Sequence, residues 1–273
     1  MVINTIYAVY YSATGTTDRT VNTFADALAE QFGVPVKRIP FTKPADRARE
    51  YSFSEGDLVV VGTPTYAGRM PNKIMPDFRD HLRGNGALAV PVVLFGNRAY
   101  ENSLAELRTL LEANAFHTVA AAAFVGQHAF ATALAEGRPD YSDRQEMKKF
   151  AKSIYDKVIN LTGESALIKV PGDPEAPYYV PKCLDGQPAR FLKAKPQTNL
   201  SKCTNCGACA RQCPMGAIDS NRVAEVPGIC IKCQSCVHRC TRHAKYFDDP
   251  AFLSHKAMLE QQFTEPKENE FFL

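Results

Sequence analysis

The chain has 273 residues, a net charge of +3 and nine cysteines, and 45% of its residues are hydrophobic. This length leaves room for more than one domain, since a domain typically holds about 100 to 200 residues. No apolar run approaches the ~18 residues needed to cross a bilayer, which excludes a membrane span. Because residues 1–11 show no signal segment, we expect a cytoplasmic protein whose thiols stay reduced.

Four continuous apolar runs predict strands that are buried on both faces of a sheet. They span residues 6–11, 58–62, 90–96 and 119–126. Between them, apolar residues recur at intervals of three and four, which predicts helices with one apolar stripe each. The stripes consist of Val21, Phe24, Ala25 and Leu28, and of Met147, Phe150, Ala151 and Ile154. Alternating strands and helices predict an α/β fold with a doubly wound parallel sheet over residues 1–162.

The loop after the first predicted strand is rich in hydroxyl groups and leads into a helix, at the end of the sheet where doubly wound folds bind ligands. Backbone amides and hydroxyl groups at a helix start suit a phosphate group. The loop lacks the Gly-Lys-Ser/Thr ending of a Walker loop and has no cation, so a single terminal phosphate bound by neutral donors fits best. The alternative is a plain helix N-cap. The candidate residues are Ser12, Ala13, Thr14, Gly15, Thr16 and Thr17.

The loops after the second and third predicted strands each combine an aromatic residue with small residues. We expect Tyr66 and Tyr100 to stack on the two faces of a flat ligand, while backbone amides near Gly68 and Asn97 bind its polar edge. The alternative is that both tyrosines are ordinary loop anchors. The candidate residues are Thr63, Pro64, Thr65, Tyr66, Ala67 and Gly68, and Gly96, Asn97, Arg98, Ala99 and Tyr100.

With these three loops, residues 1–162 resemble a flavodoxin. The resemblance implies noncovalently bound FMN, with its phosphate in the first loop and its flavin between Tyr66 and Tyr100. Arg69 and Arg98 depart from the acidic character of many flavodoxins. A positive charge beside the flavin favours its anionic reduced form and raises its potential, whereas the alternative is an arginine that points to solvent.

Residues 163–196 contain six prolines, which predicts an extended, stiff connector that holds the next domain against the first. Cys183, the ninth cysteine, is either a redox thiol or an inert residue, and no adjacent cation or helix start favours the first alternative. Basic residues in and after the connector either steer an acidic, ferredoxin-like redox partner or form a solvated surface. Nucleic acid is disfavoured because no base-stacking aromatics alternate with these charges. The basic residues are Lys182, Arg190, Lys193, Lys195 and Lys202.

Two cysteine runs share the spacing Cys-x2-Cys-x2-Cys-x3-Cys, which is the pattern of ferredoxins with two [4Fe-4S] clusters. In that pattern the last cysteine of each run ligates the cluster of the other run. Two structural zinc sites are the alternative, although zinc motifs usually separate two cysteine pairs by a longer loop. The predicted ligands are Cys203, Cys206, Cys209 and Cys240 for cluster 1, and Cys230, Cys233, Cys236 and Cys213 for cluster 2.

Residues 201–246 resemble the bacterial two-cluster ferredoxins, which implies a second, smaller α+β domain over residues 197–247. Thr241 departs from this resemblance, because the family usually has proline after the last cysteine of each run, as at Pro214. The substitution removes no predicted ligand.

The C-terminal segment, residues 248–273, is predicted to contain a short helix and a tail. The helix is indicated by the apolar residues Phe252, Met258 and Leu259. We expect residues 265–273 to fray, as chain termini usually do.

The whole chain resembles a bacterial family of fused flavodoxin-ferredoxin proteins, in which the segment around His128 follows the last strand of the sheet. His128 then borders the flavin, or is a loop histidine satisfied by local hydrogen bonds. The resemblance implies an anaerobic electron-transfer protein that links two-electron and one-electron partners through FMN and two [4Fe-4S] clusters. One alternative is a flavin oxidoreductase acting on NAD(P)H or a small acceptor, although no Gly-x-Gly-x-x-Gly loop or acid-base pair is evident. The other is a redox sensor that binds a partner without turnover.

Overall fold

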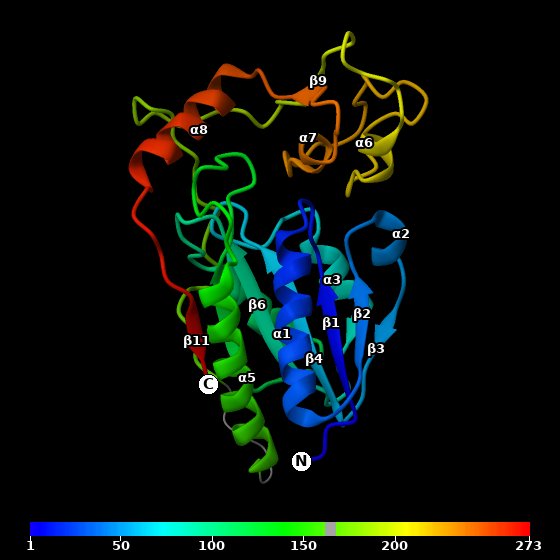
Figure 1. Ribbon diagram of the computed structural model, residues 1–273, viewed down its shortest axis with the longest axis vertical. Coiled ribbons are helices and arrows are strands. Elements are labelled where there is room, and N and C mark those ends of the chain that lie inside the picture. The colour runs from blue at the N-terminus through cyan, green and yellow to red at the C-terminus, as the bar shows by residue number, and fades with distance from the viewer. Residues whose placement is uncertain (162–167) are drawn as a thin grey trace.

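The computed structural model describes residues 1–161 and 168–273, so the predicted boundary between residues 162 and 163 lies outside the described residues. Its central sheet contains β2 (Val36–Pro40), β1 (Thr5–Tyr10), β4 (Asp57–Pro64), β6 (Leu88–Phe95) and β8 (Ala121–Val125), in that order (Figure 1). Each neighbouring pair among these five strands is parallel. Numbered along the chain, they have the 2-1-3-4-5 order of the flavodoxin-like doubly wound fold.

The four predicted apolar runs form β1, β4, β6 and β8, as expected. In β6 every residue is buried, because helices cover the sheet on both sides. The sequence did not indicate β2, since this edge strand is short and its Lys37 and Arg38 are exposed. A strand with one partner and polar side chains has no continuous apolar run to reveal it.

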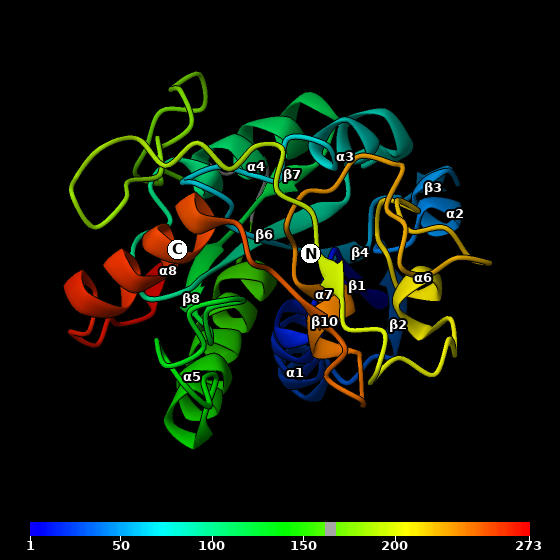
Figure 2. The same cartoon turned by 90° about the horizontal axis from the view of Figure 1, so that it is seen from above.

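Two pairs of helices cover the two faces of the sheet, as Figure 2 shows. On one face lie α1 (Thr16–Phe32) and α5 (Tyr141–Ile159), and on the other lie α3 (Met75–His81) and α4 (Ser103–Ala113). Both predicted apolar stripes are buried, and Phe24 of α1 packs edge-on against Phe124 of β8 with ring centroids 5.8 Å apart. The shorter elements are α2 (Pro44–Arg47), β3 (Tyr51–Ser52), β5 (Leu82–Arg83) and β7 (His117–Thr118).

The C-terminal tail is part of the sheet, so the expectation that it frays was wrong. After α8 (Pro250–Gln262), the chain forms β11 (Glu270–Phe272), which pairs antiparallel with β8. The side chain of Asn269 accepts a hydrogen bond from the N–H of Val125 at 2.9 Å, and the ring of Phe271 packs on Phe150 at 4.7 Å. The tail therefore covers an edge of β8 that would otherwise be unpaired.

The cysteine-rich part lies beyond the carboxyl ends of the sheet strands (Figure 1). Its elements are β9 (Gln197–Thr198) and β10 (Lys245–Tyr246), which pair antiparallel, and the short helices α6 (Ala208–Arg211) and α7 (Ser235–His238). This is the smaller α+β unit that the resemblance implies. Within the described parts of the chain, no helix has both the length and the apolar character needed to cross a membrane.

The described part of the connector, residues 168–196, contains no helix and is held against the flavodoxin-like part by hydrogen bonds. The hydroxyl of Tyr178 donates to the carbonyl of Met70 at 2.7 Å, and the N–H of Tyr179 donates to the carbonyl of Ala67 at 2.9 Å. Residues 168–196 are therefore attached to the flavodoxin-like part, but they are not extended throughout, because the chain reverses direction between Lys182 and Pro188.

Candidate functional site

The first loop presents hydrogen-bond donors that have no partner among the described residues. Helix α1 begins at Thr16 after Gly15, whose φ of 97° lies in the left-handed region that favours glycine. No side chain caps this helix, which argues against the plain N-cap interpretation. Within the described residues, the backbone N–H groups of residues 13–18 donate to no carbonyl or side chain. The Oγ of Ser12 is also buried without a partner. Free donors at a positive helix end form a cradle that a phosphate group fits.

Two arginines lie beside this loop, which corrects the expectation of neutral donors only. Guanidinium nitrogens of Arg19 and Arg239 come within 3.5 Å and 3.9 Å of the position that a Cβ on Gly15 would take. Arg19 lies on the first turn of α1, so its position was readable from the sequence. Arg239 follows α7 in the cysteine-rich part, and only the tertiary structure brings it here. Both parts of the chain therefore contribute positive charge to one anion site.

The second loop forms a tight turn at the end of β4. Tyr66 and Arg69 exchange backbone hydrogen bonds, and the residues between them, Ala67 and Gly68, have φ values of 49° and 79°. A Cβ on Gly68 would meet the carboxylate of Glu101, so the turn and the third loop pack directly on each other. The Tyr66 side chain is half-buried at this position.

The third loop is occupied by the C-terminal tail. The side-chain amide of Asn97 donates to the carbonyls of Phe263 and Glu265, and its oxygen accepts from the N–H of Lys267. The hydroxyl of Tyr100 donates to the carboxylate of Glu270 at 2.7 Å, and only 6% of Tyr100 is exposed. Burial and then this carboxylate raise the pKa of Tyr100. Tyr100 is placed as a loop anchor, and Tyr66 is the ring left free for stacking.

Arg69 and Arg98 are mostly buried and each pairs with a carboxylate, so the alternative that they point to solvent is wrong. Arg69 pairs with Glu106 at 2.6 Å, and this hydrogen bond raises the pKa of Arg69. Arg98 pairs with Glu101 at 2.6 Å, and its guanidinium carbon lies 3.9 Å from the ring centroid of Tyr179. Carboxylates and connector tyrosines thus compensate both charges. No local pattern in the sequence indicates this role of the connector.

His128 is satisfied inside its own loop. Its Nδ1 accepts hydrogen bonds from the N–H groups of Ala131 at 3.1 Å and Phe130 at 3.4 Å, and its ring packs against Gly96. Burial, followed by the charges of His255 and Arg98, lowers the pKa of His128 to about 4. The imidazole is therefore neutral at pH 7.

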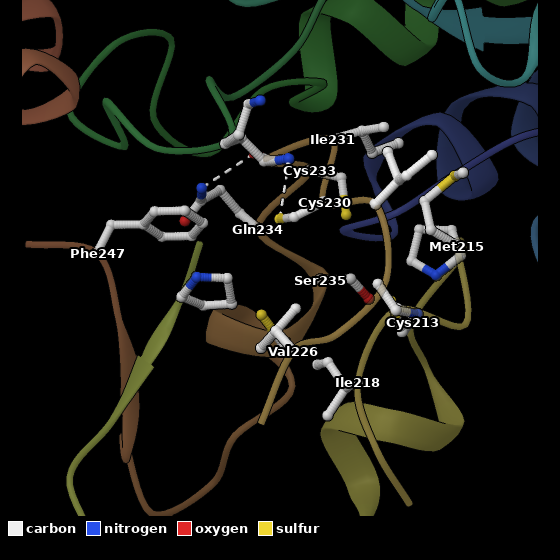
Figure 3. A pocket seen from close by; sticks show the side chains of 16 residues that line it. Cys213, Met215, Ile218, Val226, Cys230, Ile231, Cys233, Gln234, Ser235 and Phe247 are labelled. Carbon is white, nitrogen blue, oxygen red and sulfur yellow. Dashed lines mark hydrogen bonds between the residues drawn. The ribbon is translucent and has the colours of Figure 1, made fainter. Parts of the chain in front are cut away.

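The eight motif cysteines line two separate cavities, in the groups that the spacing pattern predicts. One cavity is lined by Cys213, Cys230, Cys233 and Cys236, which we call the proximal cysteine group (Figure 3). The other is lined by Cys203, Cys206, Cys209 and Cys240, the distal cysteine group, and all its lining residues fall within residues 198–245. Each cavity therefore draws one cysteine from the other run.

The two cysteine runs fold alike at an offset of 27 residues. Left-handed residues occur two, four and thirteen positions after the first cysteine of each run. Backbone N–H groups donate to the first and last sulfur of each run at 3.2–3.4 Å. The left-handed residues are Asn205, Gly207 and Gly216, and Lys232, Gln234 and His243. The same backbone thus presents four thiols twice, with N–H donors that favour the thiolate form.

The thiols suit a cluster better than a single zinc ion. All nine cysteines are free. Burial raises the pKa of Cys233, and it raises the pKa of Cys236 to about 12, so both need a positive ligand to ionise. Within residues 1–161 and 168–273, no three His, Cys, Asp or Glu side chains converge closely enough to hold one metal ion. Sulfur atoms that surround a cavity without meeting at one point fit a larger inorganic core.

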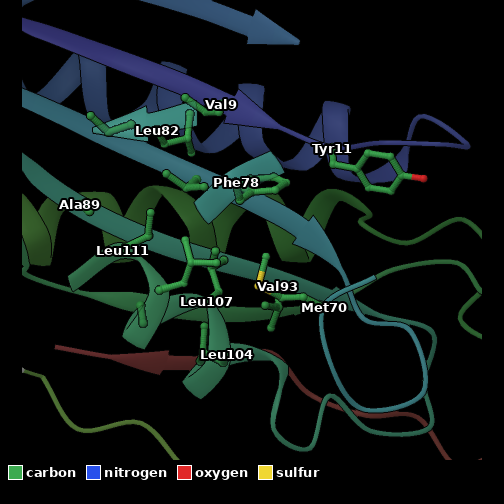
Figure 4. Close-up of a cluster of buried hydrophobic side chains, with 14 of the residues drawn as sticks. Val9, Tyr11, Met70, Phe78, Leu82, Ala89, Val93, Leu104, Leu107 and Leu111 are labelled. Carbon is green, nitrogen blue, oxygen red and sulfur yellow. The ribbon is translucent and has the colours of Figure 1, made fainter. Parts of the chain in front are cut away.

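The proximal cysteine group lies directly on the flavodoxin-like core. Cys233, with Met215 and Ile231, packs against the apolar cluster that contains Tyr11 and Ala13 of the first loop. Figure 4 shows the hydroxyl of Tyr11 directed away from the other labelled core residues, beyond the end of β1. Burial and the Cys233 thiol both raise the pKa of Tyr11, so its phenol stays neutral.

Two polar contacts fix the same interface. The Nη2 of buried Arg47 donates to the carbonyl of Pro214 at 2.9 Å, and the Nε2 of His238 hydrogen-bonds with the carbonyl of Ala129 at 2.7 Å. Arg47 is itself held by Asp77 at 2.5 Å. The interface therefore places the proximal cysteine group on the side of the three candidate loops and the distal cysteine group farther from them.

Among the comparisons with known proteins, a family match supports the description of the cysteine-rich part. A family described as a 4Fe-4S binding domain matches residues 196–219, which include Cys203, Cys206, Cys209 and Cys213. No curated protein matches the chain.

Among solved structures, the similarity lies in the N-terminal part. A flavodoxin from the domain Archaea is 16% identical, with a TM-score of 0.42, covering 58% of this chain and 100% of that chain. The Streptococcus pneumonia TIGR4 flavodoxin is 20% identical, with a TM-score of 0.40 and coverages of 56% and 99%. Rubredoxin oxygen:oxidoreductase from Desulfovibrio gigas is 16% identical, with a TM-score of 0.38 and coverages of 58% and 37%. At these scores the fold assignment rests on the strand order.

Proposed function

Because the chain joins a flavodoxin-like α/β domain to a 4Fe-4S binding domain, we propose that it is an electron-transfer protein that carries FMN and two [4Fe-4S] clusters. When bound, FMN supplies two-electron chemistry and the clusters supply one-electron chemistry. The contact that carries the proposal is the packing of Cys233 on the same apolar cluster as Tyr11 and Ala13. It brings a cluster ligand next to the loop proposed to hold the FMN phosphate.

The first loop supports FMN through its chemistry. The orphan Oγ of Ser12 and the free N–H groups of residues 13–18 offer neutral donors, and Arg19 and Arg239 add positive charge. A phosphate dianion would satisfy all of these groups at once. The half-buried ring of Tyr66 would stack on one face of the flavin, and the turn at Gly68 would bring backbone close to its edge. Tyr100 would support this site from behind as an anchor of the third loop.

The second cluster is supported by the repeat of backbone geometry. The family match ends at residue 219, but the second run reproduces the left-handed positions and the N–H to sulfur bonds of the first. The backbone geometry that surrounds one proposed cluster site is thus repeated around the other. The crossed grouping of the cysteines ties the two half-motifs together, so that each cavity needs both runs.

The order of the sites defines an electron path. The proximal cysteine group would exchange electrons with FMN, and the distal cysteine group would exchange them with a redox partner. Cys206 of the distal group is exposed, as are the cations Lys202, Arg211 and Arg242 around it. The basic residues predicted to steer a partner are likewise exposed on the protein surface. An acidic one-electron carrier protein fits this surface by charge.

The test is an anaerobic titration of the loaded protein with NADH, NADPH and then a strong chemical reductant, with flavin and cluster absorbances followed separately. We expect bleaching only by the strong reductant, with electrons shared between flavin and clusters. Rapid bleaching by a nicotinamide would show an oxidoreductase instead of a carrier. A protein whose flavin and clusters reduce independently would overturn the internal electron path.

A further inference from the structure

One buried cation in the cysteine-rich part has no anionic partner. Only 3% of Lys245 on β10 is exposed, and its Nζ donates to the Oγ1 of Thr198 at 2.7 Å and to the carbonyl of Val223 at 2.5 Å. Both acceptors are neutral. Within the described residues, Lys245 forms no ion pair with a carboxylate. A buried ammonium without a counter-charge is strongly unfavourable, and the residues that the structure describes supply no counter-charge for it.

The cavity beside Lys245 is where that counter-charge belongs. Lys245 lines the same cavity as all four cysteines of the distal group, and no acidic residue lines it. A [4Fe-4S] core with four thiolates carries net negative charge, and net charge is one of the properties that sets its potential.

We propose that Lys245 is the buried counter-ion of the cluster held by the distal cysteine group, and that it raises the reduction potential of this cluster. The redox step concerned moves one electron from the proximal to the distal site, with no bond made or broken. A fixed positive charge stabilises the more negative, reduced state. Lys245 would therefore draw electrons outward, away from the flavin and toward the exposed side of the protein. This inference rests on the proposed function.

Lysines elsewhere near the clusters differ from Lys245 in exposure. Lys202, next to Cys203, is exposed, so water screens its charge. Lys232 lines the proximal cavity and its Nζ donates to the carbonyl of Leu192 at 2.9 Å. Because Lys202 and Lys245 flank the same cysteine group but differ in burial, replacing each by glutamine isolates the effect of burial.

The experiment is a redox titration of the loaded full-length protein monitored by EPR, with iron and sulfide content measured on each sample. Lys245→Gln removes the positive charge and retains side-chain N–H donors, on a side chain that is one bond shorter and carries an added carbonyl oxygen. We expect its distal cluster to be about tenfold harder to reduce, which is about 59 mV for a one-electron couple. Lys245→Arg should titrate like the unaltered protein, and Lys202→Gln should shift much less.

Each possible result of this titration either supports or overturns the proposed role of Lys245. Loss of the distal cluster in Lys245→Gln, with retention in Lys245→Arg and Lys202→Gln, would also support a counter-ion. The inference would be overturned if Lys245→Arg also lost the distal cluster. It would also be overturned if Lys245→Gln and Lys202→Gln changed the reduction potential of this cluster equally. Failure of the proposed function looks different, because unaltered protein would then contain too little iron and sulfide for two clusters, or its flavin and clusters would not share electrons.

Discussion

The guanidinium of Arg47 donates to the carbonyl of Pro214, 167 residues further along the chain. This bond joins α2 of the flavodoxin-like part to the residue that follows Cys213, a member of the proximal cysteine group. Arg47 is buried and is anchored by Asp77 and by the carbonyl of Thr42. The Arg47 side chain therefore helps to hold Cys213, a proposed cluster ligand, in place relative to the flavodoxin-like part.

Replacing Arg47 by methionine should weaken this interface. The change leaves the carbonyl of Pro214 without its donor and Asp77 without its cation, which costs about 1–3 kcal/mol in the free energy of unfolding. Electron exchange between flavin and clusters should slow in the same variant. Chemical denaturation and rapid anaerobic mixing measure the two effects. The matched control is Arg38→Met, which removes an exposed pair with Asp26 and should cost less than about 1 kcal/mol. Equal costs for the two variants would contradict a special role for Arg47.

Asn97 links the third loop to the C-terminal tail, so Asn97→Ala should loosen the tail. The substitution leaves the carbonyls of Phe263 and Glu265 and the N–H of Lys267 without partners, and we expect a loss of about 1–3 kcal/mol. Hydrogen exchange in β11 and in β8 should accelerate more than in β1. In the control, Asn221→Ala changes an exposed residue and should leave these rates unaltered. Slow exchange in β11 of Asn97→Ala would show that strand pairing alone holds the tail.

The fold and the two groups of motif cysteines were predictable because their signals are local. Strands such as β6 are continuous apolar runs, and the cysteines of each run follow one another at fixed spacing. The contacts that complete the site are not local. Arg239 reaches Gly15 from the other part of the chain, and Glu270 reaches Tyr100 across 170 residues. No periodicity links such residues, so the sequence suggested a free third loop where the structure has one bound to the tail.

Acid should destabilise the protein through His128. Its pKa is lowered from 6.5 to about 4, so the folded state favours the neutral ring. Its contribution to stability is fully present above pH 6.5, because the ring is then neutral in both states. As the pH falls from 6.5 toward 4, the unfolded chain gains a proton that the folded chain does not, and up to about 3 kcal/mol is lost. Denaturation of His128→Gln should show a flatter slope in this window, whereas the exposed control His243→Gln should keep the steep slope.

Removing the unpaired hydroxyl of Ser12 should maintain or raise the stability of the FMN-free protein but weaken its binding of FMN. Without FMN, Ser12→Ala should be as stable as the unaltered protein or more so, because a buried group without a partner disappears. FMN affinity should fall about tenfold, because one hydrogen-bond donor to the phosphate is lost. This change corresponds to about 1.4 kcal/mol of binding free energy. Calorimetry with FMN and thermal melts of apoprotein measure both effects. Ser153→Ala on the exposed side of α5 is the control. Unchanged FMN affinity in Ser12→Ala would remove Ser12 from the phosphate site.

Paired cysteine variants test whether the ligands cross between the two runs. Cys203 and Cys240 line the same cavity, whereas Cys213 lines the other. The double variant Cys203→Ala/Cys240→Ala should therefore lose one cluster and keep half of the iron, because both changes remove ligands from the same cavity. The double variant Cys203→Ala/Cys213→Ala should lose nearly all of it, although both changes fall in one run. Cys183→Ala, outside both cavities, should keep the full iron content. If ligands came from one run each, the iron contents of the two double variants would be reversed.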